Sequence, residues 1–473
     1  ESWIEMNDKI PFIKLFRTLD NFYFFDVNSN SIVRINEAVS HKIEDLIAGN
    51  DILNQDMDIA RLKKRGYLKA NNENIIVEHS ALNTVGEYMN GNLRQLILQV
   101  TQNCNLRCKY CVYSGSYVNR THTKKRMSFE IAKQAVDFYF AHNTNKDAGV
   151  ISFYGGEPLL EMELIKKIVV YSEKLYEGKE LRFNMTSNAT LLTDEIADFL
   201  YEHNFNLTIS LDGPEEVHNQ SRVFADSKTG TFQCIIKNLE KMIGRYPDYI
   251  SNISFNAVLD STNDFKCSSN FFTYDFMKNT VVGATTLNEN GNKHEIQYSE
   301  MFDINYRYEL FKCYLKYIGR LDKKFTSKIV DNQVGSLKQE IHEKIKAPYS
   351  RGKTCHPSGP CIAGAVRLFV TVEGVFYPCE RVSETCNAYV IGNLQDGFDI
   401  EKIKSLLNVG ALTAEQCKNC WAIEYCNSCA SGIDDGDKLC PEKRLARCND
   451  IKKGCELRMI EYCTLREMGC SFE

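Results

Sequence analysis

The pattern of apolar and polar positions divides the chain into segments with different periodicities. Between residues 94 and 290, short apolar runs alternate with longer stretches whose apolar positions repeat at helical spacing, which is typical of β/α units on a parallel sheet. Six such units predict an α/β fold, a partial (β/α)6 barrel with its chemistry at the C-terminal ends of the strands. The predicted strands are 95–101, 149–154, 181–187, 206–211, 251–258 and 280–285, and the predicted helices are 128–142, 161–177, 193–203, 231–245 and 263–278.

Residues 1–85 carry a different pattern, in which three short apolar strands precede two amphipathic helices. Asn28, Ser29 and Asn30 separate the second strand from the third, as expected for a tight turn. Strands followed by helices in so short a segment predict a small winged-helix-like module. The strands are expected at 12–16, 21–27 and 31–36, and the helices at 36–48 and 56–65.

The rest of the chain divides into two further segments. Residues 291–350 contain amphipathic patterns at 298–320 and 335–346 and are predicted to form a helical bridge. Residues 351–473 are rich in cysteine. The predicted domains are therefore the module at 1–85, the barrel at 86–290, the bridge at 291–350 and a cysteine-rich domain at 351–473.

Cysteine content is the unusual feature of the composition. The 473-residue chain has 19 cysteines, but it shows neither a signal peptide nor an apolar run of transmembrane length, which argues against an exported disulfide framework. The cysteines cluster at metal-like spacings, so we expect them to be reduced and metal-loaded in a cytoplasmic protein. A net charge of −5 without a basic block predicts no nucleic-acid surface, and no membrane partner is expected.

The strongest chemical signal is a loop that directly follows the first barrel strand. Cys104, Cys108 and Cys111 form a C-x3-C-x2-C motif. Iron–sulfur clusters normally take four cysteine ligands, so three thiolates would hold a [4Fe–4S] cube and leave one iron open. A structural zinc site or three buried cysteines are the alternatives, but zinc would require a fourth ligand nearby. Tyr110 precedes the last cysteine, a position from which its ring could pack beside an adenine.

This loop resembles the cluster motif of the radical S-adenosyl-L-methionine (AdoMet) enzymes. The resemblance implies that AdoMet binds the open iron through its methionyl amine and carboxylate. It also implies that one-electron reduction cleaves AdoMet to methionine and a 5′-deoxyadenosyl radical, so that the cofactors supply the chemistry and the protein directs it.

Three more segments at predicted strand ends resemble AdoMet-binding motifs of the same family. Paired glycines let the backbone approach a ligand closely, and an arginine can match a carboxylate with two hydrogen bonds. The resemblance implies contacts to the AdoMet amine, ribose and carboxylate. For Glu157 and Asp212 a structural role in the protein is the alternative. The implied cofactor-binding residues are Tyr110, Gly155, Gly156, Glu157, Ser187, Asn188, Ser210, Asp212 and Arg222.

The C-terminal segment contains a second cysteine pattern. A predicted hairpin at 365–378 presents one cysteine, and a C-x2-C-x5-C-x2-C run follows it. The arrangement resembles the SPASM domain of radical AdoMet enzymes that modify peptides, and it implies two auxiliary [4Fe–4S] clusters. The implied ligands are Cys355, Cys361, Cys379 and Cys429 for the first cluster, and Cys417, Cys420, Cys426 and Cys448 for the second.

The ligand assignment has alternatives. Two residues rather than three separate the last cysteine pair of the run, so Cys440 is an alternative to Cys429. Zinc is an alternative metal for the C-x2-C-x5-C part. Filled four-cysteine sites favour electron transfer, whereas the loss of Cys355 would leave an open iron on the first cluster.

Glu380 directly follows Cys379. In the related sulfatase-maturating enzymes a carboxylate at this position is the proposed base, so the resemblance makes Glu380 a candidate catalytic base. A solvated turn residue is the alternative.

The N-terminal module resembles the recognition element of enzymes that modify ribosomally made peptides. In that family a leader peptide adds a strand to the edge of the sheet. The leading hypothesis is therefore an enzyme, a radical AdoMet peptide maturase of the sactipeptide type. It would close an intramolecular thioether between a cysteine sulfur and a carbon of a Cys-containing precursor peptide.

The hypothesis implies three [4Fe–4S] clusters, AdoMet, and an electron donor such as flavodoxin or ferredoxin. A maturase that forms carbon–carbon crosslinks would use the same parts. An anaerobic sulfatase-maturating enzyme, which makes formylglycine, shares the auxiliary cysteines but lacks the N-terminal module. A non-enzymatic electron carrier is the alternative from a different class, and it would neither bind nor cleave AdoMet.

Overall fold

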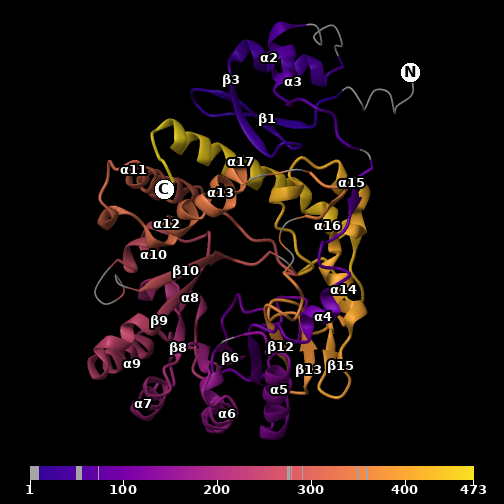
Figure 1. Ribbon diagram of the computed structural model, residues 1–473. Coiled ribbons are helices and arrows are strands. Elements are labelled where there is room, and N and C mark those ends of the chain that lie inside the picture. Colours follow the sequence, from indigo (N-terminus) through magenta and orange to yellow (C-terminus); the bar gives the residue numbers. More distant parts are fainter. Residues whose placement is uncertain are drawn as a thin grey trace.

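A ten-stranded sheet lies in the lower half of the molecule as drawn in Figure 1, with the strand order β10-β9-β8-β7-β6-β5-β12-β13-β14-β15. The computed structural model describes residues 10–49, 56–72, 74–146, 148–273, 277, 280–289, 291–347, 349, 351–357, 359 and 361–472. Among these residues, no helix is long and apolar enough to cross a bilayer.

Six neighbouring strands of this sheet are parallel and coincide with the six predicted barrel strands. Their alternation with helices confirms the predicted β/α units. The strands are β5 (Leu96–Thr101), β6 (Ala148–Gly155), β7 (Glu180–Ser187), β8 (Asn206–Ser210), β9 (Ile253–Leu259) and β10 (Val281–Thr286). The sheet does not close, because β10 is one edge and β5 pairs onward with β12.

The helices of the barrel cover its outer face and begin at the expected signals. Ser128 and Thr193 each accept a hydrogen bond from a backbone N–H of the first helical turn, which is the usual capping arrangement. The barrel helices are α5 (Phe129–Ala141), α6 (Met162–Leu175), α7 (Asp194–Glu202), α8 (Glu215–Ser221), α9 (Phe232–Arg245) and α10 (Phe265–Phe271). The sequence pattern missed the short α8. Of the helix predicted at 263–278, residues 274–276 and 278 lie outside the described residues.

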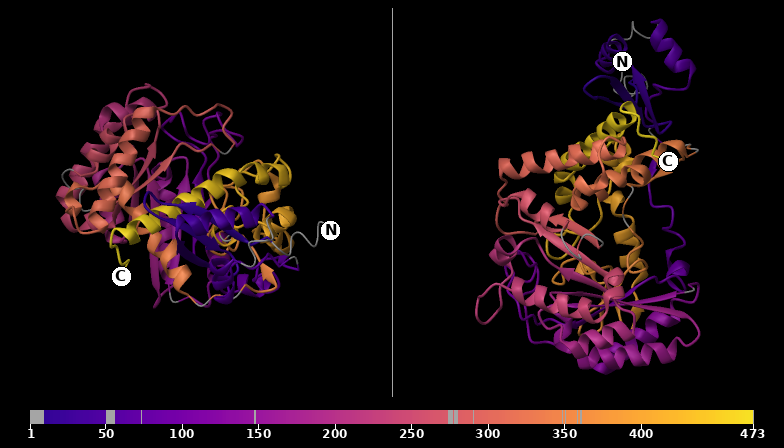
Figure 2. Two further views of the ribbon diagram at one scale, coloured as in Figure 1. Left: turned by 90° about the horizontal axis from the view of Figure 1, so that it is seen from above. Right: turned by 90° about the vertical axis from the view of Figure 1, so that its left-hand side faces the viewer.

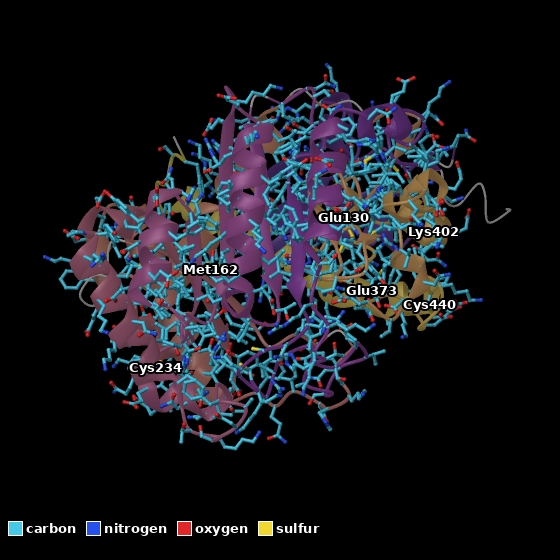
Figure 3. All side chains as sticks on the ribbon, turned by 90° about the horizontal axis from the view of Figure 1, so that it is seen from below. Glu130, Met162, Cys234, Glu373, Lys402 and Cys440 are labelled. Carbon is cyan, nitrogen blue, oxygen red and sulfur yellow. The ribbon has the colours of Figure 1, made fainter. Side chains whose placement is uncertain are left out.

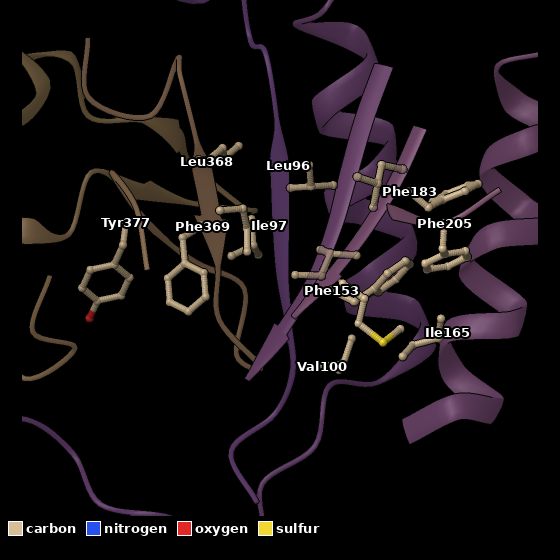
Figure 4. Packing of buried hydrophobic residues seen from close by; sticks show 14 of the residues in the cluster. Leu96, Ile97, Val100, Phe153, Ile165, Phe183, Phe205, Leu368, Phe369 and Tyr377 are labelled. Atoms are coloured by element: carbon tan, nitrogen blue, oxygen red, sulfur yellow. The ribbon is translucent and has the colours of Figure 1, made fainter. Parts of the chain in front are cut away.

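The predicted C-terminal hairpin continues the barrel sheet. β12 (Leu368–Val370) runs parallel to β5 with Leu368 opposite Leu96, and it pairs antiparallel with β13 (Val375–Tyr377). Figure 4 shows the apolar side chains of both segments packed together. β14 (Gly392–Asn393) and β15 (Gly397–Phe398) complete the sheet. The cysteine-rich segment is therefore built onto the first barrel strand.

The N-terminal module has the predicted strands and helices, in the order β1-β2-β3 for its separate sheet. Alternate side chains of β2 face opposite sides: Phe24 packs with the module's own helices, whereas Tyr23 and Phe25 pack with residues of α17. The module lies at the end of the molecule opposite the barrel, with α17 between them (Figure 2). Its elements are β1 (Ile13–Arg17), β2 (Phe22–Asp26), β3 (Ser31–Ile35), α2 (Glu37–Ile47) and α3 (Met57–Lys64).

The remaining elements connect the module, the barrel and the C-terminal segment. The bridge contains the predicted long helix α11 (Glu300–Tyr317), but a π-helical turn at Lys338–His342 interrupts the helix predicted at 335–346. The others are β4 (Ile76–Val77), α4 (Val85–Met89), α12 (Lys328–Gly335), α13 (Glu343–Lys346), β11 (Thr354–Cys355), α14 (Ile400–Leu407), α15 (Ala414–Lys418), α16 (Pro441–Ala446) and α17 (Cys448–Glu467).

We expect Glu467→Ala to loosen the contact between the N-terminal module and α17. The Glu467 carboxylate accepts hydrogen bonds from the Thr18 hydroxyl at 2.8 Å and the Tyr23 hydroxyl at 2.6 Å, and leaving both donors without their acceptor costs about 1–3 kcal/mol. Hydrogen–deuterium exchange of β1 and β2 measures the effect. Glu456→Ala is the control on the same helix, because the half-exposed Glu456–Lys14 pair is worth about 1 kcal/mol or less. If the amides of β1 and β2 are equally protected from exchange in both variants, the hydrogen bonds to Glu467 do not hold the module on α17.

Candidate functional site

The three cysteines of the first motif lie together in the loop after β5. The Cys111 N–H donates to the Cys108 carbonyl at 3.1 Å, and the Leu106 N–H points at the Cys104 sulfur at 3.4 Å. Burial raises the pKa of the Cys104 thiol to about 12, and the neighbouring thiols of Cys108 and Cys111 add to this shift. Thiols this close fit a cationic iron–sulfur cluster, because metal binding deprotonates cysteine ligands.

The loop after β6 packs directly on the cysteine loop. The Gly156 N–H donates to the Thr101 carbonyl at 3.0 Å, and the Glu157 N–H donates to the Asn103 carbonyl at 2.9 Å. Gly155 has a φ of +146°, and a Cβ atom at Gly155 would lie 2.1 Å from the Thr101 oxygen; one at Gly156 would lie 2.0 Å from the Asn103 oxygen. Only glycine fits here, so the two glycines determine where the cysteine loop lies.

Glu157 joins the ends of β6 and β7. Its buried carboxylate accepts hydrogen bonds from the Ser187 hydroxyl at 2.7 Å, the Asn188 N–H at 2.8 Å and the Leu159 N–H at 3.0 Å. Burial raises the pKa of Glu157 even though these hydrogen bonds favour its charged form. The Asn188 side chain in turn donates to Asn105 of the cysteine loop at 3.0 Å. These contacts give Glu157 a structural role at the site.

Asp212 and Arg222 form a buried ion pair beside the cysteine loop. Arg222 donates from Nε at 2.9 Å and from Nη2 at 3.0 Å to the two Asp212 oxygens. Asp212 also accepts from the Tyr110 hydroxyl and the Val258 N–H. Burial alone would raise the pKa of Asp212, but Arg222 outweighs it and holds that pKa below its usual value. Ser210 ends β8, opposite Asn256 of β9.

A cavity of about 2220 Å³ lies on the inner face of the barrel sheet. Polar side chains from successive strands line one wall, among them Ser152, Asn184 and Thr208. α11 and α17 line the opposite side, and residues near the C-terminal cysteines, including Glu380 and Cys429, complete the lining. The barrel and the cysteine-rich segment therefore share one cavity.

Glu380 lies on the wall of this cavity. Its Oε1 atom accepts from Arg367 Nη1 at 2.7 Å and lies 3.7 Å from Arg381 Nε. Its Oε2 atom is buried and has no hydrogen-bond partner among the described residues. Glu380 is thus a paired cavity residue with one free acceptor and not a solvated turn residue.

The C-terminal cysteines form two neighbourhoods. Burial raises the pKa of the Cys379 thiol to about 11, and nearby Glu380, Cys361 and Cys429 raise it further. Cys417 and Cys448 similarly lie close enough to Cys426 to raise its pKa, after the larger effect of burial. Within the described residues, no group of three or more His, Cys, Asp or Glu side chains is arranged to hold a single metal ion.

Cys355 lies apart from the other cysteines of its predicted set. It packs in a buried cluster with Ile75, Val77, Cys417 and Ile423, where β11 pairs with β4. The structure therefore places Cys355 beside a cysteine of the second predicted set. Cys440, at the periphery (Figure 3), donates to Glu442 at 3.1 Å.

Two residues near the cysteines, Cys455 and Glu384, were not predicted from the sequence to belong to the site. Cys455 on α17 is close enough to Cys426 and Cys420 for both to raise its pKa, after burial. Glu384 contacts the segments on both sides of the first cysteine motif. No spacing rule could reveal either contact, because the partners are distant in the sequence.

Comparisons with known proteins agree with this architecture. Residues 98–261 match the model of the Radical SAM superfamily. This part of the chain is therefore similar to that superfamily, and the predicted α/β fold class with its mostly parallel central sheet is confirmed. Native anSMEcpe with bound AdoMet and the Kp18Cys peptide superimposes with a TM-score of 0.53 over 77% of this chain and 99% of that chain, at 21% identity. At this identity the likeness shows a shared fold.

Curated relatives cover different parts of the chain. The uncharacterized protein MJ0907 of Methanocaldococcus jannaschii is 35% identical over 172 residues, which are 36% of this chain and 54% of the relative, so the chain spans about half the length of that relative. A cysteine-type anaerobic sulfatase-maturating enzyme of Clostridium novyi is 24% identical over 351 residues, 71% of this chain and 87% of the relative.

We expect Gly156→Ala to displace the cysteine loop. The added methyl group would overlap the Asn103 carbonyl and contact the Cys104 side chain, and such overpacking costs about 1–3 kcal/mol. Iron content after anaerobic reconstitution, together with thermal unfolding, measures the effect. Gly244→Ala is the matched control, because its Cβ meets no atom within 4 Å. Full iron content in Gly156→Ala would show that the glycine does not determine the position of the loop.

Proposed function

We propose that this chain is a radical AdoMet enzyme that modifies a ribosomally synthesised peptide by closing an intramolecular thioether. The observation that carries the proposal is the cavity of about 2220 Å³ shared by the barrel and the cysteine-rich segment. Sites for small molecules usually enclose about 300–1,000 Å³, so a cavity of this size favours a polypeptide substrate. Its polar wall would accept a peptide backbone.

The radical site would be formed by the three-cysteine loop and the strand ends around it. Cys104, Cys108 and Cys111 would hold the [4Fe–4S] cluster, which together with AdoMet supplies a carbon-centred radical when reduced by one electron. Tyr110, Gly155, Gly156, Ser187, Asn188, Ser210 and Arg222 are the proposed AdoMet contacts. Glu157 and Asp212 would position them, because both carboxylates accept hydrogen bonds from other residues of the site.

The C-terminal cysteines would hold two auxiliary clusters. Cys361, Cys379 and Cys429 are proposed ligands of the first, and Cys417, Cys420, Cys426 and Cys448 of the second. The Cys355→Ala variant tests whether Cys355 is the fourth ligand of the first cluster. A loss of about four irons would make Cys355 a ligand, whereas unchanged iron with a lower unfolding temperature would make it a packing residue of the β4–β11 cluster.

Glu380 is the proposed base. Closing a thioether removes a hydrogen atom from carbon and a proton from the cysteine thiol of the substrate. The free Oε2 atom of Glu380 can accept that proton, while Arg367 holds the other oxygen in place at 2.7 Å. The remaining electron would pass to an auxiliary cluster.

The N-terminal module would bind the leader of the precursor at β3. β3 is an edge strand of its sheet, and an unpaired edge is a template for a further strand. A groove of about 670 Å³ beside it is lined by residues of β3 and α3, including Arg34, Arg61 and Leu62. At the other edge, Phe12 already donates to the Lys69 carbonyl at 2.9 Å.

A sulfatase-maturating activity is the second candidate. It is favoured by the alignment that covers 87% of the Clostridium novyi relative, and the same cavity and carboxylate would serve it. The N-terminal module favours the peptide maturase. Product mass separates the two, because a thioether keeps the sulfur and loses two hydrogens, whereas formylglycine made from cysteine loses the sulfur.

We expect the anaerobically reconstituted chain to hold about twelve irons, and the Cys104→Ala, Cys108→Ala, Cys111→Ala variant to hold about four fewer. The variant should make no 5′-deoxyadenosine from AdoMet and dithionite. Iron and sulfide analysis and liquid chromatography measure the two quantities. Cys267→Ala is the control, because this exposed cysteine lies outside both motifs. Bound zinc in place of iron, or no 5′-deoxyadenosine from the intact chain, would refute the radical mechanism.

We expect modification to depend on the leader of the precursor peptide. For a Cys-containing precursor peptide that the chain modifies, removal of the leader should raise KM at least about tenfold, the effect of losing about 1.4 kcal/mol of binding. Added leader peptide should inhibit competitively, and a scrambled leader should not. Equal modification of the leaderless peptide would contradict the assigned role of the module.

A further inference from the structure

One buried carboxylate of the C-terminal segment binds the radical-site loop from both sides. Glu384 accepts hydrogen bonds from Gln99 Nε2 at 2.9 Å, from the Tyr113 hydroxyl at 2.9 Å and from Arg120 Nε at 2.8 Å. Its side chain is only 5% exposed. Buried charges persist where they are paired and fully hydrogen-bonded, and Glu384 meets both conditions.

The three donors bracket the cysteine motif. Gln99 lies in β5 before Cys104, whereas Tyr113 and Arg120 follow Cys111. Glu384 itself follows Cys379 and Glu380 in the segment after the hairpin. The backbone N–H of Glu384 also donates a hydrogen bond to the side chain of Asn119, which follows the cysteine motif, at 3.1 Å. The carboxylate thus connects the two cysteine regions.

The network also brings a positive charge beside the cysteine loop. The Arg120 guanidinium lies 3.8 Å from the centre of the Tyr113 ring, and its Nη2 atom is buried without a hydrogen-bond partner among the described residues. Tyr113 lies two residues after Cys111 in the chain, and its ring also contacts His122, with 6.0 Å between the ring centres. His122 lies next to the same cysteine, with Nε2 3.8 Å from Sγ.

We propose that Glu384 is a positioning residue that fixes the three-cysteine loop against the C-terminal segment and, by neutralising Arg120, sets the reduction potential of the cluster held there. The inference rests on the proposed function, because it requires a cluster at Cys104, Cys108 and Cys111. Charge near an iron–sulfur cluster shifts its potential, and buried charges are weakly screened by salt.

The sign of the effect follows from the charge of the reduced cluster. Reduction adds an electron, so an uncompensated positive Arg120 stabilises the reduced state and raises the potential. Glu384→Gln should therefore shift the potential of this cluster to a more positive value. Arg120→Gln leaves the Glu384 charge uncompensated and should shift the potential to a more negative value. The double variant removes both charges and should return the potential toward that of the unaltered chain.

The chain contains a matched control. Glu373 pairs with Lys125 at 2.6 Å and joins the same two segments, but the two side chains are 61% and 55% exposed. Solvent screens this pair, which is worth about 1 kcal/mol or less. Glu373→Gln should leave both the potential and the iron content unchanged.

The test is a redox titration of the anaerobically reconstituted full chain, followed by electron paramagnetic resonance of the reduced four-iron cluster with and without AdoMet. Iron content and unfolding temperature are measured on every variant. Opposite shifts in Glu384→Gln and Arg120→Gln, with none in Glu373→Gln, support the inference. If Glu384→Gln does not fold, the inference is tested by two measurements. They are the shift of the reduction potential in Arg120→Gln and the reversal of that shift in the double variant.

Equal potentials in iron-loaded variants would overturn this inference and leave the proposed function standing. A wild-type chain that holds no four-iron cluster at the three cysteines would overturn both. A loss of stability without a change in potential would show that Glu384 only supports the fold.

Discussion

The parallel pairing of β12 with β5 is the constraint on which the rest of the arrangement depends. Leu368 lies opposite Leu96 and Phe369 opposite Ile97, and these side chains are almost completely buried. A one-residue slip would turn every one of them to the wrong face of the sheet, so the register is fixed. The three-cysteine loop leaves the end of β5, and Cys379, Glu380 and Glu384 follow the hairpin that begins at β12. One strand pairing thereby sets the distance between two cysteine-containing regions that are far apart in the sequence.

Around this pairing, close backbone contacts and buried carboxylates hold the loops of the site in place. Gly155 and Gly156 let the loop after β6 approach the cysteine loop more closely than any side chain would allow. The buried carboxylates of Glu157 and Asp212 are each fully bonded to neighbouring loops. A buried charge that lost its partner would cost about 3–5 kcal/mol, so these groups strongly favour one arrangement of the loops. Such rigidity suits the proposed function, in which a radical would meet only one carbon atom of its substrate.

α17 connects the ends of the molecule. It begins at Cys448, a proposed cluster ligand, and ends at Glu467, which binds Thr18 and Tyr23 of the N-terminal module. One side of the helix lines the cavity, and another packs on the module's sheet. The module is therefore attached through an apolar core and buried hydrogen bonds, not only through its linker. A peptide held at β3 would be held at a fixed distance from the cavity.

The sequence by itself determined the class of fold, because alternating apolar strands and amphipathic helices have few other solutions. It also located the three-cysteine motif, whose cysteines lie close together in the chain. It also predicted the N-terminal strands and the C-terminal hairpin from local periodicity. Only the tertiary structure decided that the hairpin extends the barrel sheet, that Cys355 lies beside Cys417 and that Glu384 binds Gln99, Tyr113 and Arg120. The physical reason is sequence separation: periodicity and spacing report on neighbours along the chain, whereas a buried carboxylate and its partners meet only when distant segments pack.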